Sequence, residues 1–134
     1  MTVTTSLGYL IKHISKLRRL SAEQIAIITN RELIAFHQDK EVGTPARPFI
    51  NAAGEIMSPP EYYGKSSFGI HVFIVNTNNL TSNKTIDFAS VPGLVGDRFL
   101  VHDMWSSLDI GVFSESITVT LVAHDTAAYR LTRV

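Results

Sequence analysis

The chain has 134 residues, of which 45% are hydrophobic and 18% are charged, and its 12 basic and 12 acidic side chains give a net charge of zero at pH 7. One ordinary domain has this length, whereas a (β/α)8 barrel needs about 250 residues. The absence of cysteine excludes disulfides and thiolate sites. With neither excess charge nor an apolar run near the ~20 residues of a membrane span, we expect neither nucleic acid nor a membrane as a partner.

Short helices are predicted in the first 40 residues. Residues 1–12 have neither the charged start nor the long apolar stretch of a signal peptide, so we expect no export signal in them. Ser21 and Gln24 match the spacing of a capping box, which predicts a helix over 21–29, and Asn30 precedes a second helix over 31–37. These helices carry a set of large apolar side chains, namely Ile25, Ile27, Ile28, Leu33 and Phe36.

The rest of the chain has the pattern of a β-domain. Proline and glycine interrupt residues 40–48, where we expect a connector without regular structure, and Asn51 to Gly54 predicts a turn. Ile117, Val119 and Leu121 alternate with threonine and should share one buried face. Short strands separated by turns predict a mainly β fold, an antiparallel and Greek-key-like β-sandwich preceded by short α-helices. The expected strands are 68–75, 85–88, 99–105, 110–113, 116–121 and 128–134.

Titratable side chains give no pattern of a catalytic or metal site. Four aspartates lie at expected strand ends or turns, where aspartate commonly accepts hydrogen bonds from nearby backbone N–H groups; they are Asp97, Asp103, Asp109 and Asp125. The five histidines are scattered and have no acidic partner at the spacing of a metal ligand. We therefore predict no catalytic, cofactor-binding or metal-binding residue in this chain, and no cofactor.

Two other groups of residues are candidates for binding or modification. Tyr62, Tyr63 and Trp105 are candidates for stacking on a sugar, although packing is the favoured explanation, at a strand start for the two tyrosines and at a strand end for the tryptophan. Asn79 and Asn83 each begin an N-x-Thr sequon in an expected polar loop over 76–83, which makes both candidate N-glycosylation sites.

Several motifs in colinear order resemble the C-terminal part of the melibiase-type α-galactosidases, a glycoside hydrolase family. Residues 20–39 resemble the last helical segment of that family, with His37 where the family usually has asparagine. The later motifs resemble its fungal branch and are Gly43–Pro48, Glu61–Ser67, Asp103–Trp105, Leu108–Gly111 and His124–Ala127.

The resemblance runs from about Leu17 to Val134 and implies a fragment of a larger enzyme. Residues 1–40 would be the helical remnant of a catalytic barrel, with 1–16 unmatched, and residues 41–134 would be the C-terminal antiparallel β-domain. Members of the family are retaining glycosidases that remove terminal α-galactose from oligosaccharides, using two aspartates on barrel strands. No position here matches either aspartate motif, so no catalytic residue is carried over and we expect the chain to be inactive alone.

The resemblance also implies partners and surroundings. The absent barrel would be the natural packing partner, and without it the apolar helix face should make the chain aggregation-prone, oligomeric or poorly folded. A galactoside would be the substrate of the full-length family only; the choice between galactose and N-acetylgalactosamine stays open. The family is secreted, whereas the localisation of this chain is left open. Two alternatives remain: a non-catalytic carbohydrate-binding or interaction module, and a truncated gene product.

Overall fold

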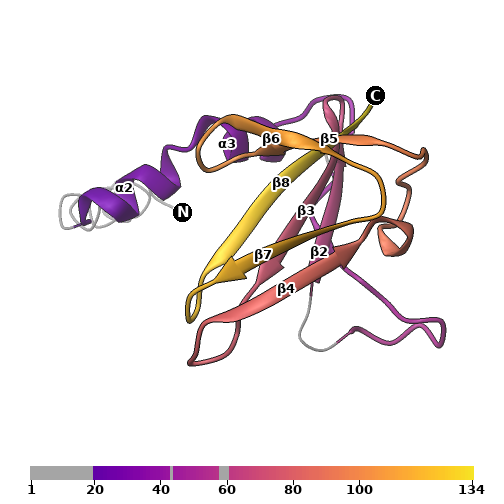
Figure 1. The fold of residues 1–134 in the computed structure, drawn as a ribbon. Coiled ribbons are helices and arrows are strands. Elements are labelled where there is room, and N and C mark those ends of the chain that lie inside the picture. Colours follow the sequence, from indigo (N-terminus) through magenta and orange to yellow (C-terminus); the bar gives the residue numbers. More distant parts are fainter. Residues whose placement is uncertain (1–19, 43, 58–60) are drawn as a thin grey trace, which may run out of the picture. The chain divides into compact units, whose positions relative to one another are not determined.

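The computed structural model describes residues 20–42, 44–57 and 61–134 (Figure 1). The chain divides into two units, of which the first ends at Arg31 and the second begins at Glu32. The first unit contains α2 (Ala22–Ile28), and its predicted start is confirmed. Ser21 Oγ accepts a hydrogen bond from the Gln24 N–H at 3.2 Å, and Gln24 Oε1 accepts one from the Ser21 N–H at 3.0 Å. No residue of α2 is buried, so its isoleucines are exposed.

The second unit is an antiparallel β-sandwich, as the sequence predicts. A six-stranded sheet has the order β1-β2-β3-β8-β5-β6, and a two-stranded sheet pairs β4 with β7 (Figure 1). The elements are α3 (Arg31–His37), β1 (Arg47–Pro48), β2 (Glu61–Ser66), β3 (Gly69–Val75), β4 (Ser82–Asp87), the 3-10 helix η1 (Phe88–Ser90), β5 (Phe99–Asp103), β6 (Leu108–Phe113), β7 (Ser116–Leu121) and β8 (Thr126–Arg133).

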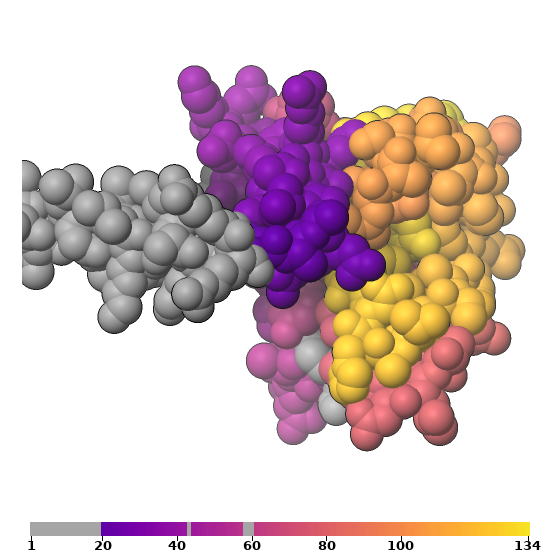
Figure 2. Space-filling view, turned by 90° about the vertical axis from the view of Figure 1, so that its left-hand side faces the viewer, coloured from indigo at the N-terminus to yellow at the C-terminus, as the bar shows by residue number. Residues whose placement is uncertain are grey.

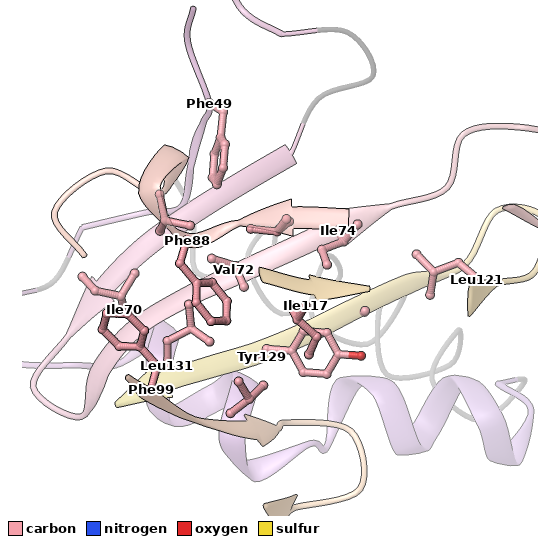
Figure 3. Close-up of a cluster of buried hydrophobic side chains, with 14 residues drawn as sticks. Phe49, Ile70, Val72, Ile74, Phe88, Phe99, Ile117, Leu121, Tyr129 and Leu131 are labelled. Atoms are coloured by element: carbon pink, nitrogen blue, oxygen red, sulfur yellow. The ribbon is translucent and has the colours of Figure 1, made fainter. Parts of the chain in front are cut away.

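Side chains from both sheets form one core between them (Figure 3). Ile70, Val72 and Ile74 of β3 are buried because alternate residues of a strand point to the same face. On the opposite sheet Ile117 and Leu121 are buried while Thr118 and Thr120 are exposed, so the predicted alternation of β7 is confirmed. Among the described residues, no helix combines the length and the apolar character needed to cross a membrane.

Several local expectations were wrong. Arg47 and Pro48 form β1 within the expected connector, because they pair with Tyr63 and Tyr62 of β2. The strand expected over 99–105 ends at Asp103, and Met104 and Trp105 belong to the turn that follows. The remaining strands are confirmed to within three residues at either end, and β2 contains the strand start expected at Tyr62 and Tyr63.

Phe36 of α3 does not face outward toward a missing partner, as its place in the apolar set implied. Its ring lies 4.6 Å from the ring of His71 and 5.4 Å from that of Phe73, measured between centroids. Both of these residues belong to β3, on the face of the large sheet opposite the core, since their neighbours Val72 and Ile74 point into the core. Phe36 therefore packs α3 onto the outer face of its own β-sandwich.

Candidate functional site

The three aromatic candidates do not form a common platform. Trp105 lies in the turn between β5 and β6 and is 39% exposed, and its indole N–H donates to the carbonyl oxygen of Thr126 at 2.8 Å. Tyr62 and Tyr63 are adjacent on β2 and therefore point to opposite faces of the sheet. Tyr63 packs edge-on against Phe49 at 5.7 Å, against the core. Since β3 and β8 separate β2 from the Trp105 turn, no two of these rings can hold one sugar between them.

A cluster of four ionisable side chains lies on the outer face of the large sheet. Glu32 of α3 accepts hydrogen bonds from Arg130 of β8 and from His102 of β5, both at 3.0 Å. The other ring nitrogen of His102, Nδ1, lies 2.7 Å from Oδ1 of Asp109 on β6. Asp109 was expected to bind backbone N–H groups in a turn, and this was wrong because its carboxylate pairs with His102 across the β5–β6 ladder.

No sequence pattern predicts this cluster, because its members lie up to 98 positions apart. The register of the strand pairing brings three of its members together, because His102 on β5 is opposite Arg130 on β8 and opposite Asp109 on β6. The imidazole ring of His102 lies between the carboxylates of Glu32 and Asp109, and Glu32 is also paired with Arg130. Such a network fits the attachment of α3 to three strands, and no group of side chains in the described ranges is arranged to hold a metal ion.

A second attachment follows α3. Asp39 is buried, and its carboxylate accepts hydrogen bonds from the Ser67 hydroxyl and N–H and from the N–H groups of Glu41 and Val42. These donors, the Ser67 hydroxyl first, lower the pKa of Asp39 to about 2, because they favour the ionised carboxylate. The residues between α3 and β1 are thereby fixed to the turn between β2 and β3.

Buried His71 lies beneath Phe36. Its Nε2 is 2.6 Å from the Ser66 hydroxyl and its Nδ1 is 3.3 Å from the sulfur of Met104, so a neutral ring satisfies both partners. Burial, which disfavours the charged form, is the largest cause that lowers the pKa of His71 to about 4. His71 is thus a packing residue of the outer face.

A surface hollow beside η1 offers no better site. It carries the carboxylates of Asp87, Asp97 and Glu115. The aromatic rings in its wall, Phe88 and Phe99, are buried in the core and stack on each other edge-on at 5.4 Å. A sugar therefore finds carboxylates there but no exposed aromatic face.

Both sequon asparagines are exposed at the surface of the sandwich. Asn79 lies in the loop between β3 and β4, and Asn83 lies on β4. The buried amide of Asn76 holds this loop, because its Nδ2 donates to the carbonyl oxygens of Leu80, Leu121 and Val122 at 2.8–3.0 Å. The loop was expected to extend to Asn83, but it ends at Thr81 because Ser82 and Asn83 pair with Leu121 and Thr120 of β7. It is anchored at its first position by a buried residue.

Comparison with known proteins agrees with this architecture. A family model described as the alpha galactosidase C-terminal beta sandwich domain matches residues 60–131. A protein of Emericella nidulans named as a probable alpha-galactosidase B is 34% identical over 125 residues, which are 84% of this chain and 28% of the relative. Its counterpart from Aspergillus fumigatus is 33% identical over 126 residues, covering 81% of this chain and 30% of the relative.

Solved structures show the same fold. Alpha-galactosidase I from Mortierella vinacea superposes with a TM-score of 0.72 at 20% identity, over 86% of this chain and 30% of that one. The alpha-galactosidase of Saccharomyces cerevisiae with raffinose gives a TM-score of 0.67 at 17% identity, over 84% and 38%. The chain spans less than a third of the length of the curated relatives it matches. It belongs to the α-galactosidase C-terminal β-sandwich family.

Proposed function

We propose that this chain is the C-terminal part of a secreted retaining α-galactosidase and acts only together with a catalytic barrel. The family match over residues 60–131 of a chain that spans 28% of its relative supports this proposal. Within it, residues 1–40 belong to the barrel's helical shell and residues 41–134 to the β-domain. The terminal galactoside is then a substrate of the assembled enzyme, bound by the barrel.

The carboxylates of the β-sandwich support placing the chemistry elsewhere. A retaining glycosidase needs two carboxyl groups about 5–5.5 Å apart on either side of the sugar. Glu32 and Asp109 approach a common centre, but the ring of His102 occupies the space between them. Since each carboxylate is already hydrogen-bonded to this ring, the pair has no room for a glycosidic bond.

The exposed isoleucines of α2 support a missing partner. Ile25, Ile27 and Ile28 are 44%, 53% and 51% exposed, although complete burial of such a side chain contributes about 1.5–3 kcal/mol. We propose that the barrel of the full-length enzyme covers them. The isolated chain should therefore self-associate and bind a hydrophobic dye, and a triple substitution of these isoleucines by serine should abolish both. A monomeric wild-type chain without dye binding would contradict this partner.

Activity measurements test the proposal directly. The isolated chain should release no nitrophenol from p-nitrophenyl α-galactoside. A chimera in which this chain replaces the matching region of the Emericella nidulans relative should hydrolyse it, whereas that relative truncated before the region should be inactive or insoluble. Activity of the isolated chain, or a folded chimera without activity, would refute the proposed role.

A further inference from the structure

We propose that Asn79 carries an N-linked glycan whose first sugars cover the exposed side chains of Leu80 and Val122. The proposal rests on the proposed function in one respect, because N-glycosylation requires entry into the secretory pathway. The acceptor sequence Asn79-Leu80-Thr81 lies in an exposed bend between β3 and β4, which is the setting in which such sequons are used.

Two apolar side chains stand out at this end of the sandwich. Leu80 is 77% exposed and Val122 is 59% exposed. Their carbonyl oxygens both accept hydrogen bonds from Nδ2 of Asn76, at 2.9 Å and 2.8 Å, so the two residues lie close together. Figure 2 shows salmon-pink residues of the β3–β4 region directly against yellow residues of the C-terminal part of the chain. An apolar pair beside a sequon suits a sugar, which has both hydroxyl groups and an apolar face of C–H groups.

The amide of Asn79 is oriented for attachment. Its Oδ1 accepts a hydrogen bond from Nε2 of His124, at 2.9 Å, in the turn between β7 and β8. No hydrogen bond within the described ranges uses its Nδ2, which is the atom that carries a glycan. By contrast, Nδ2 of Asn51 donates to Glu55 and Nδ2 of Asn76 donates to three carbonyls. A glycan on Asn79 would therefore leave the existing hydrogen bond to His124 intact.

The modification needs a co-substrate from the host, a lipid diphosphate-linked oligosaccharide. Nδ2 of Asn79 loses a proton and forms a bond to C1 of the first N-acetylglucosamine. The bond between C1 and the diphosphate oxygen breaks, and the lipid diphosphate leaves with the electron pair. No oxidant or reductant takes part.

Asn83 supplies a matched control within the same protein. It also begins a sequon, and its Oδ1 accepts a hydrogen bond from the Thr120 hydroxyl at 2.7 Å on the exposed face of β4 and β7. The neighbouring pair on that face is Thr85 and Thr118, whose hydroxyl groups lie 2.8 Å apart. The surroundings of Asn83 on this face are thus polar, so a glycan there would cover no comparable apolar pair.

The test is translation of the chain behind a secretory leader with endoplasmic reticulum microsomes, followed by peptide N-glycosidase and mass spectrometry. We expect Asn79 to be converted to aspartate by the glycosidase, and the corresponding band shift to be lost in Asn79→Gln and in Thr81→Ala but kept in Asn83→Gln. An unmodified Asn79 in a chain protected inside the microsomes, in a reaction that glycosylates a control acceptor, would overturn the site.

A second measurement tests the covering of the apolar pair. Removal of the glycan from folded protein should increase binding of a hydrophobic dye, and the increase should vanish in a Leu80→Ser/Val122→Ser variant. Dye binding that is unchanged by deglycosylation would overturn the covering. Neither measurement needs enzyme activity, so a glycosylated chain in an inactive chimera would refute the proposed function alone.

Discussion

Gly64 of β2 provides the space that the ring of Phe36 occupies. A Cβ atom at position 64 would overlap Cζ of Phe36, lie 2.7 Å from Cε2 and stand 3.6 Å from Cα of Ala46. Carbon atoms pack best at about 3.5–4.0 Å, so Gly64→Ala forces the ring to move. The ring has little freedom to do so, because His71 and Phe73 already lie against it.

The size of the effect follows from these contacts. Overpacking of this kind costs about 1–3 kcal/mol, so we expect Gly64→Ala to destabilise the domain by about 2 kcal/mol. Removal of a fully buried phenylalanine costs about 3–5 kcal/mol, and Phe36 is half-buried, so Phe36→Ala should cost about 2 kcal/mol. In the double variant the methyl group meets no ring, so Gly64→Ala should then cost close to nothing, and the two changes should be coupled by about 2 kcal/mol.

Urea unfolding of the wild type, both single variants and the double variant measures this coupling. Leu108→Ala, on exposed β6, serves as the control, because its effect should simply add to that of Gly64→Ala. Additive costs of Gly64→Ala and Phe36→Ala would refute the contact and, with it, the packing of α3 on the outer face.

Three further predictions concern buried polar groups. The pKa of His71 is lowered to about 4 from 6.5, so on acidification the unfolded chain takes up the proton first, and the free energy of unfolding falls by roughly 3 kcal/mol at most between pH 6.5 and pH 4. His71→Phe should reduce this loss of stability in thermal melts, and an unchanged dependence of the melting temperature on pH would contradict the role of His71. Asp39 has its pKa lowered to about 2 from 3.8, so it stabilises the fold above pH 3.8 and loses that effect toward pH 2. Asp39→Asn should therefore lower the free energy of unfolding at pH 7 but not at pH 2, whereas the exposed control Asp97→Asn should not show this difference. Equal losses of stability at both pH values would exclude this role of Asp39. Asn76→Asp would place a carboxylate against three carbonyl oxygens and should cost about 3 kcal/mol or more in urea unfolding at pH 7, whereas exposed Asn78→Asp should cost little; similar costs would show that the buried amide is not an anchor.

Local patterns in the sequence predict local structure well here. The capping box at Ser21 places the start of α2, and the alternation of Ile117, Val119 and Leu121 identifies the buried face of β7. Both signals arise from neighbours along the chain, which share one helix turn or one strand face. The class of fold follows from many such signals, and the structure confirms it.

Long-range pairing explains what the sequence could not predict. β2 contains glycine, lysine and serine in place of an apolar alternation, and it is a strand because β1 and β3 pair with it. The network of Glu32, His102 and Arg130 depends on α3 lying against β5 and β8, whose residues are 70 and 98 positions further along the chain. No local rule specifies such neighbours, which is why Asp109 and Phe36 were given the wrong partners.

The position of β8 in the large sheet has a consequence for folding. This strand lies between β3 and β5, so the sheet has no direct ladder between its early half and its late half. During translation β8 is synthesised after every other strand of the sandwich. Until residues 126–133 emerge from the ribosome, β1-β2-β3 and β5-β6 remain separate parts of the sheet with unpaired edge strands. The domain should therefore fold cooperatively and only after β8 has been synthesised. Before that point the nascent chain should need protection from aggregation.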